Sequence, residues 1–268
     1  MRQGSPGFTL LELCIVLVIV ALIIGGILVG RSMIHAAEVR SIVSDISKYS
    51  DALNNFRGKY QALPGDMKNA VRFWGAVTGG TADGQDAACI AYFDAAHTKT
   101  QATCNGNGNG LIPVTGNWHE AWRGWQHLAN AGMISGLYTG QGAGASGTPA
   151  QNDSKLEYSS PSSRINNLTY LFLTEDTATA AHTFKFAGEY GLTLLIGTDS
   201  ELDAPALKAA DAEVIDAKLD NGKPGTGVIR AYKNSVRPHC SSTDDPLTAL
   251  YTTADEEIGC NLYYIMKQ

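Results

Sequence analysis

Hydrophobic residues are concentrated at the N-terminal end of the chain. Residues 1–7 are polar, and an apolar run then extends from Phe8 to Gly30 with Glu12 as its only charge. The uncharged part, Leu13 to Gly30, would span about 27 Å as an α-helix. Together with the residues from Phe8 to Glu12, it is long enough to cross a hydrocarbon core of about 30 Å. The pattern therefore predicts a transmembrane helix over residues 8–30.

Beyond Arg31 the apolar residues recur at helical spacing, and charged residues occupy the positions between them. The stripe consists of Val39, Ile42, Ile46, Tyr49, Leu53, Phe56 and Tyr60. Such a stripe suits a coiled coil or, as we favour, a long helix that packs on its own globular domain. Leu63-Pro64-Gly65 should end the helix. We therefore expect an amphipathic half over 31–62 and a head over 63–268.

The head should contain short helices and strands between glycine-rich loops. Helices are expected at Met67–Trp74 with Asp66 as N-cap, at Asn117–Ala131 and at Ala204–Leu219. Strands are expected at Leu168–Leu173, Thr183–Ala187, Tyr190–Ile196, Val228–Tyr232 and Asn261–Met266, with the second and third joined as a hairpin. This order predicts an α+β fold, in which a long N-terminal helix packs on an antiparallel sheet with loop-rich insertions.

Charge and cysteine content narrow the class of protein. The formal net charge of −6 does not predict a nucleic-acid-binding surface. Cys14 lies in the apolar run, whereas the polar part of the chain holds an even number of cysteines without C-x-x-C spacing: Cys89, Cys104, Cys240 and Cys260. Two disulfides in an oxidising compartment are favoured, with free buried thiols as the alternative.

The N-terminus differs from a secretory signal peptide, because no small-residue cleavage site closes the apolar run. The polar segment with Arg2 precedes the run, which favours a cytoplasmic N-terminus. Glu12 is costly inside a membrane span, by about 2.5–3.5 kcal/mol at the centre and less near an end. It is therefore a functional candidate, and the alternative is a carboxylate that reaches the cytoplasmic interface.

The segment from Gly7 and Phe8 to Glu12, followed by an unbroken apolar run, resembles the N-terminal signal of type IV prepilins and type II secretion pseudopilins. The resemblance implies that residues 1–7 are a leader peptide. A prepilin peptidase would cut after Gly7 and methylate the amine of Phe8. Glu12 would then pair with that amine on a neighbouring subunit. Unlike many pilins, the chain has no proline between Phe8 and Pro64.

The resemblance also implies a location and partners. The chain would cross the bacterial inner membrane with its head in the periplasm, and would enter a pilus or pseudopilus after assembly. Its partners would be the prepilin peptidase, the assembly platform and other pilin subunits, with no nucleic acid. A length of 268 residues favours a minor subunit. The alternative is a periplasmic enzyme or ligand-binding module tethered by one helix.

Local pairing of the four polar-region cysteines is expected. Cys89–Cys104 and Cys240–Cys260 would each enclose a short, turn-rich loop, and the second would staple the C-terminal segment as in pilins. The chain contains no complete catalytic motif, so we expect no enzyme and no cofactor. Trp118, Trp122 and Trp125 share one helix face, which favours core packing over stacking on a sugar or base.

One weak metal candidate remains. Asn105, Asn107 and Asn109, followed by Gly110, fit the first half of a calcium loop. The twelfth loop position is Gly116 rather than Glu, and the three amide side chains are neutral, so a turn-rich loop without metal is favoured. Glu120 or Asp94 would contribute only if the fold placed it beside the loop.

Overall fold

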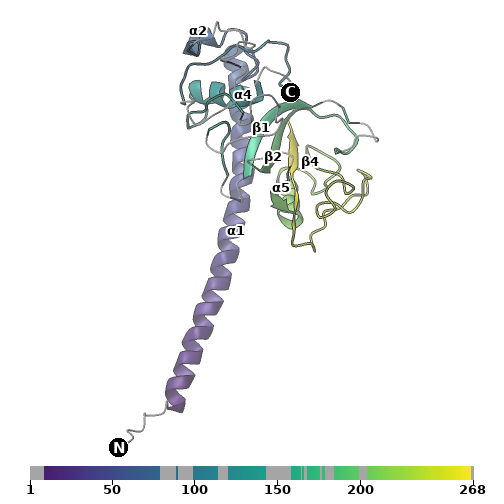
Figure 1. Ribbon diagram of the computed structural model, residues 1–268. Helices are drawn as coiled ribbons and strands as arrows, with labels where there is room; N and C mark the ends of the chain where they lie inside the picture. Colours follow the sequence, from purple (N-terminus) through teal and green to yellow (C-terminus); the bar gives the residue numbers. More distant parts are fainter. Residues whose placement is uncertain are drawn as a thin grey trace, which may run out of the picture.

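The computed structural model shows a head attached to one long helix that projects far beyond it (Figure 1). The helix, α1 (Leu10–Tyr60), has 51 residues. The structure describes residues 9–78, 89, 99–113, 120–142, 158–163, 165, 168–175, 177–178, 184–198 and 204–266. The N-terminal half of α1 forms the projection, and the C-terminal half packs against the head. The fold is α+β, as the sequence predicts.

The head combines short helices with an antiparallel sheet. The helices are α2 (Val71–Trp74), α4 (Glu120–Asn130) and α5 (Ala209–Leu219). The main sheet has the order β1-β2-β6-β4, from β1 (Leu168–Glu175), β2 (Gly191–Thr198), β4 (Ile229–Ala231) and β6 (Leu262–Ile265). A two-stranded sheet joins β3 (Leu207–Lys208) to β5 (Ile258–Cys260).

The predicted apolar stripe is the face by which α1 packs on the head. Six of its seven residues are buried, and Tyr60 is half-buried beside Phe56. Tyr49 makes edge contacts with Trp125 of α4 and Tyr170 of β1, at ring distances of 4.9 and 5.0 Å. Each buried large side chain contributes roughly 1.5–3 kcal/mol by leaving water. The docked helix, not a coiled coil, therefore accounts for the stripe within this chain.

Polar contacts also tie α1 to the head. The Tyr170 hydroxyl donates to Asp45 Oδ2 of α1 at 3.2 Å. Closer to the projecting half, the ring Nε2 of His35 lies 2.8 Å from Asp211 Oδ1 in the first turn of α5. These contacts reach both β1 and α5, so the C-terminal half of α1 is held along much of its length.

The predicted hairpin of Thr183–Ala187 with Tyr190–Ile196 is wrong. β2 pairs instead with β1, which places Leu168 opposite Thr198, and with β6 on its other edge. Among residues 184–187, only Lys185 forms a bridge, and its partner is Tyr232. β1 offers eight paired positions and a fully buried apolar face, whereas the tight connection at Gly188 and Glu189 offers local proximity alone.

Two helix starts differ from the prediction. The helix expected at Met67 begins at Val71, because the Asp66 carboxylate accepts hydrogen bonds from residues 109 and 110 rather than capping a helix. The helix expected at Ala204 begins at Ala209, because Leu207 and Lys208 pair with β5. In both cases a contact with a distant segment overrides the local signal.

Candidate functional site

The first turn of α1 holds the one acidic group of the apolar segment. Thr9 is the N-cap, and its N–H and its hydroxyl both donate to Glu12 Oε2 at 2.8 Å. In return, the N–H of Glu12 donates to Thr9 Oγ1 at 3.3 Å. This reciprocal capping box satisfies two of the backbone donors that every helix start leaves unpaired. The carboxylate is therefore held at the tip of the helix by a partner within its own chain.

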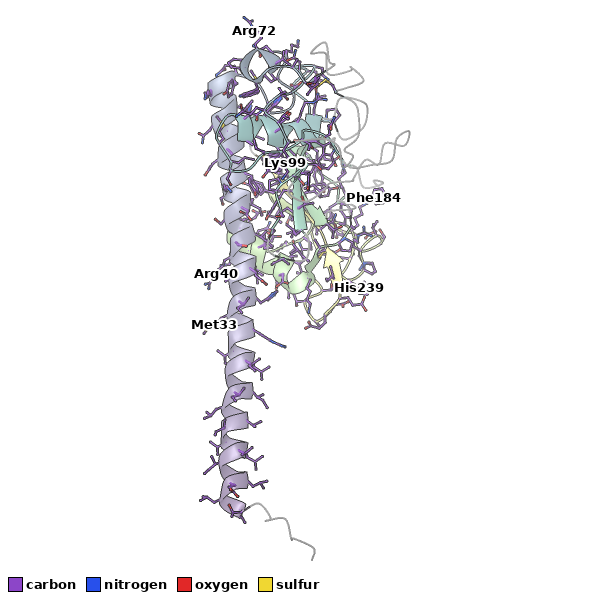
Figure 2. The ribbon with its side chains drawn as sticks, turned by 60° about the vertical axis from the view of Figure 1, so that its left-hand side comes forward. Met33, Arg40, Arg72, Lys99, Phe184 and His239 are labelled. Carbon is purple, nitrogen blue, oxygen red and sulfur yellow. A yellow bond between two sulfur atoms is a disulfide. The ribbon has the colours of Figure 1, made fainter. Side chains whose placement is uncertain are left out.

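The half of α1 that follows has no covering within the chain. Its large apolar side chains from Leu10 to Val29 are exposed, and none of its most apolar 18-residue window is buried. Figure 2 shows these side chains pointing outward on all sides below the head, up to Met33. Length and composition make this helix able to serve as a membrane span or a signal anchor.

The predicted processing site, Gly7 and Phe8, lies outside the described residues, which begin at Thr9. Glu12, the candidate assembly residue, lies within them, three residues after Thr9 in the first turn of α1.

Both expected disulfides are present. Cys89 is bonded to Cys104, and Cys240 to Cys260. The second links the segment after β4 to β5, immediately before β6, and both of its cysteines are fully buried. It therefore anchors the loop between them to the strands of the head.

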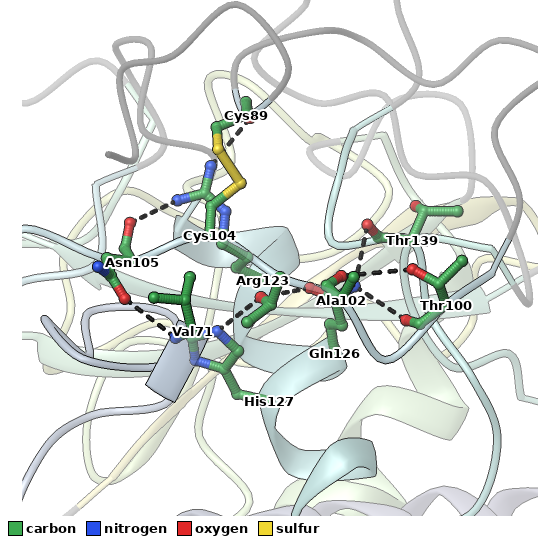
Figure 3. The surroundings of a disulfide bond; sticks show 11 residues. Val71, Cys89, Thr100, Ala102, Cys104, Asn105, Arg123, Gln126, His127 and Thr139 are labelled. Atoms are coloured by element: carbon green, nitrogen blue, oxygen red, sulfur yellow. Dashed lines mark hydrogen bonds between the residues drawn. A yellow bond between two sulfur atoms is a disulfide. The ribbon is translucent and has the colours of Figure 1, made fainter. Parts of the chain in front are cut away.

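The first disulfide lies over a buried polar layer on α4 (Figure 3). The guanidinium of Arg123 donates to the Cys89 carbonyl at 2.9 Å and to the Asn105 carbonyl at 3.2 Å. Burial lowers the pKa of Arg123 to about 10, which still leaves it charged at neutral pH. Arg123 thus joins α4 to residues on both sides of the disulfide.

His127 extends this layer. Its Nδ1 accepts from the Gly65 N–H at 2.9 Å, so the proton of the neutral ring lies on Nε2, 3.0 Å from Thr103 Oγ1. The Thr103 hydroxyl donates to Gln126 Oε1 at 2.7 Å. Burial is the main cause that lowers the pKa of His127 to about 3, so the ring is neutral at physiological pH. The chain of hydrogen bonds is a structural link between the segment after α1, α4 and the disulfide loop.

The asparagine loop is hydrogen-bonded to the start of α2. Asn105 Oδ1 accepts from the Val71 N–H, and the amide oxygens of Asn107 and Asn109 accept from the N–H groups two residues later. Asn107 and Asn109 therefore act first as turn formers, and Asn105 ties the loop to the start of α2. Among the described residues, no cluster of three or more His, Cys, Asp or Glu side chains could hold a metal.

The fold does bring Glu120 to this loop, where its Oε1 accepts from the Asn107 N–H at 2.8 Å. Asp94 lies outside the described residues. Trp122 and Trp125 are buried, which agrees with the predicted core packing, and Trp118 is outside the described part of the chain.

Comparisons with models of known protein families, with curated proteins and with solved structures found no match.

Several residues of these sites were missed from the sequence. The role of Thr9 could have been found, because Thr-x-x-Glu before an apolar run is the signature of a capping box. Arg123, Gln126 and His127 carried no such signal. Their positions on α4 are ordinary for a surface helix, and only the loops packed over them make the face buried and polar.

Proposed function

We propose that this chain is a structural subunit, and a minor one, of a type IV pilus or a type II secretion pseudopilus. In this proposal residues 1–7 are a leader, and a prepilin peptidase cleaves between Gly7 and Phe8. The helix of residues 8–30 holds the subunit in the inner membrane with the head in the periplasm, and later packs in the filament core. Other pilin subunits and the assembly platform are its partners.

The observation that carries the proposal is the uncovered apolar half of α1, continuous with the docked half. Apolar surface of this extent on a soluble protein marks a protein or membrane contact. Before assembly, the apolar half would lie in the inner membrane. In the filament, the same apolar surface would pack against the helices of other subunits. The continuous helix supports this, because a rigid rod fixed to the head sets the position of each head around a filament axis.

Glu12 supports the proposal over a simple tether. A tether needs an apolar span but gains nothing from a carboxylate at its first turn, which only makes insertion harder. In a filament core, an unpaired carboxylate would be costly, and the terminal ammonium of a neighbouring Phe8 would offset that cost. Because slipping by one subunit would leave both charges unpaired, the pair would also fix the axial register.

The testing experiment follows the chain through maturation in cells with an active prepilin peptidase. Mass spectrometry of membrane-extracted protein should give an N-methylated Phe8 terminus, and a Gly7→Glu variant should keep Met1 or Arg2 at its terminus. Sheared filaments should contain the wild-type chain. An intact leader in wild-type cells would contradict the proposal and favour the tethered module. Filaments of normal number in a strain that lacks this chain, together with its absence from wild-type filaments, would do the same.

A further inference from the structure

Glu120 is a buried carboxylate with one oxygen unaccounted for. The residue has 0% exposure, and its Oε1 accepts from Asn107. Its Oε2 is buried, and no described residue donates a hydrogen bond to it. A buried carboxylate oxygen without a partner costs free energy on the scale of a lost charged hydrogen bond. Such an atom requires either a proton or a cation.

A second carboxylate lies beside it. Asp66 is 3% exposed, and its two oxygens accept from the N–H groups of Asn109 and Gly110, at 3.0 and 2.8 Å. The loop that holds Glu120 Oε1 therefore also holds Asp66. The same short loop thus links the two acids, because residue 107 donates to Glu120 and residues 109 and 110 donate to Asp66.

No cation among the described residues donates a hydrogen bond to Glu120 Oε2. Arg123 lies one turn along α4, but its guanidinium donates to the carbonyls of Cys89 and Asn105. The side chain of Lys68 lies along Gly108, on the loop that holds Asp66. The Oε2 atom is therefore left without a direct cationic partner among the described residues.

We propose that Asp66, Glu120 and the loop from Asn105 to Gly110 bind one calcium ion, with Glu120 Oε2 as the defining ligand. The donors are all oxygens, which suits a hard cation. Calcium accepts carboxylate, amide and carbonyl oxygens in irregular geometry, whereas magnesium keeps several waters and demands an octahedron. The ion would balance the two carboxylates and fasten α4 to the segment that follows α1. The site is independent of the pilin proposal.

The test is calorimetric titration of the full chain in detergent, after removal of calcium with a chelator. We expect one calcium ion per chain, with a Kd on the order of 10⁻⁴–10⁻³ M, and no comparable response to magnesium. At 10 mM calcium, the melting temperature should rise by about 3–10 °C. The variant Glu120→Gln keeps the acceptor for Asn107 but should weaken binding by roughly tenfold or more.

The matched control is Glu213→Gln, which removes one exposed acid from α5 and should bind like the wild type. The proposal is overturned if wild-type protein shows neither heat nor a melting shift with calcium. Equal affinity in Glu120→Gln and wild type would also overturn it. A third result would also overturn it: Glu120→Gln and wild type have the same stability at neutral pH, and neither responds to calcium. Glu120 would then be protonated rather than bound to an ion.

Discussion

Thr9 and Glu12 are joined by three hydrogen bonds at the start of α1, two of them ending on the same carboxylate oxygen. Glu12 thus has a structural role in the isolated chain, as the third residue of a capped helix. Any partner that it meets in a filament must compete with Thr9 or use the other carboxylate oxygen. The cap and the charge of Glu12 are therefore separate properties, and a pair of variants can separate them.

Glu12→Ala should leave cleavage and membrane insertion intact but reduce the fraction of subunit in sheared filaments, or their total number. It removes both the charge and the cap. Glu12→Gln should have the same assembly defect, because glutamine keeps the capping box but has no charge to pair with an ammonium. The measurement compares subunit in filaments with subunit in the inner membrane, and also counts total filaments.

Wild-type assembly of Glu12→Gln together with a defect in Glu12→Ala would assign the role to the cap alone. Normal assembly of both variants would remove Glu12 as an assembly residue and reopen the tethered-module alternative.

Ile46→Ala should destabilise the head by about 2–5 kcal/mol, because Ile46 has 0% exposure in the packed face of α1. The matched control is Ile34→Ala, the same substitution on the same helix at a residue with 62% exposure. Its effect on the unfolding of the head in detergent should stay within about 0.5 kcal/mol. Chemical denaturation followed by tryptophan fluorescence measures both. Equal losses would contradict the docked arrangement of α1.

Removing either disulfide should lower the free energy of unfolding by about 3 kcal/mol, as chain-entropy estimates give for loops of this size. The variants are the double serine replacements of Cys89 with Cys104 and of Cys240 with Cys260. Cys14→Ser is the control, since Cys14 is free and exposed, and it should leave the denaturation midpoint unchanged. Peptide mapping without reductant should recover the two local pairs, and crossed pairs or free thiols in periplasmic material would contradict them.

Asp216 should make the head less stable as the pH rises. Burial raises the pKa of Asp216 to about 7, from an ordinary value of 3.8, and its oxygens accept from Gly222 and the Tyr251 hydroxyl. The folded state therefore binds more protons than the unfolded state between these values. The stabilisation by this proton is complete below about pH 4 and is lost as the pH rises through 7.

The comparison of wild type with Asp216→Asn isolates this effect. Between pH 5 and 8, wild type should lose on the order of 1–3 kcal/mol relative to the variant, as measured by urea unfolding. Glu213→Gln, an exposed acid on the same helix, should follow the wild-type curve. A parallel pH dependence of wild type and Asp216→Asn would contradict a protonated Asp216.

The sequence by itself determined the long helix, its two halves and the face that docks. An apolar run of membrane length and a stripe of period 3.6 are properties of consecutive residues, and they depend on no distant partner. Local cysteine pairing could also be predicted from the sequence, because closing a short loop between two cysteines costs little entropy.

Only the tertiary structure decided which strands pair and what the buried acids contact. The pattern of β2 shows that it is a buried strand but not that its neighbours are β1 and β6, since alternation specifies a face and not a partner. Asp66 carries the local signal of a helix cap, yet it binds a loop more than 40 residues away. Glu120 and His127 acquire their environments in the same way, because burial belongs to the packed chain as a whole and not to any one segment.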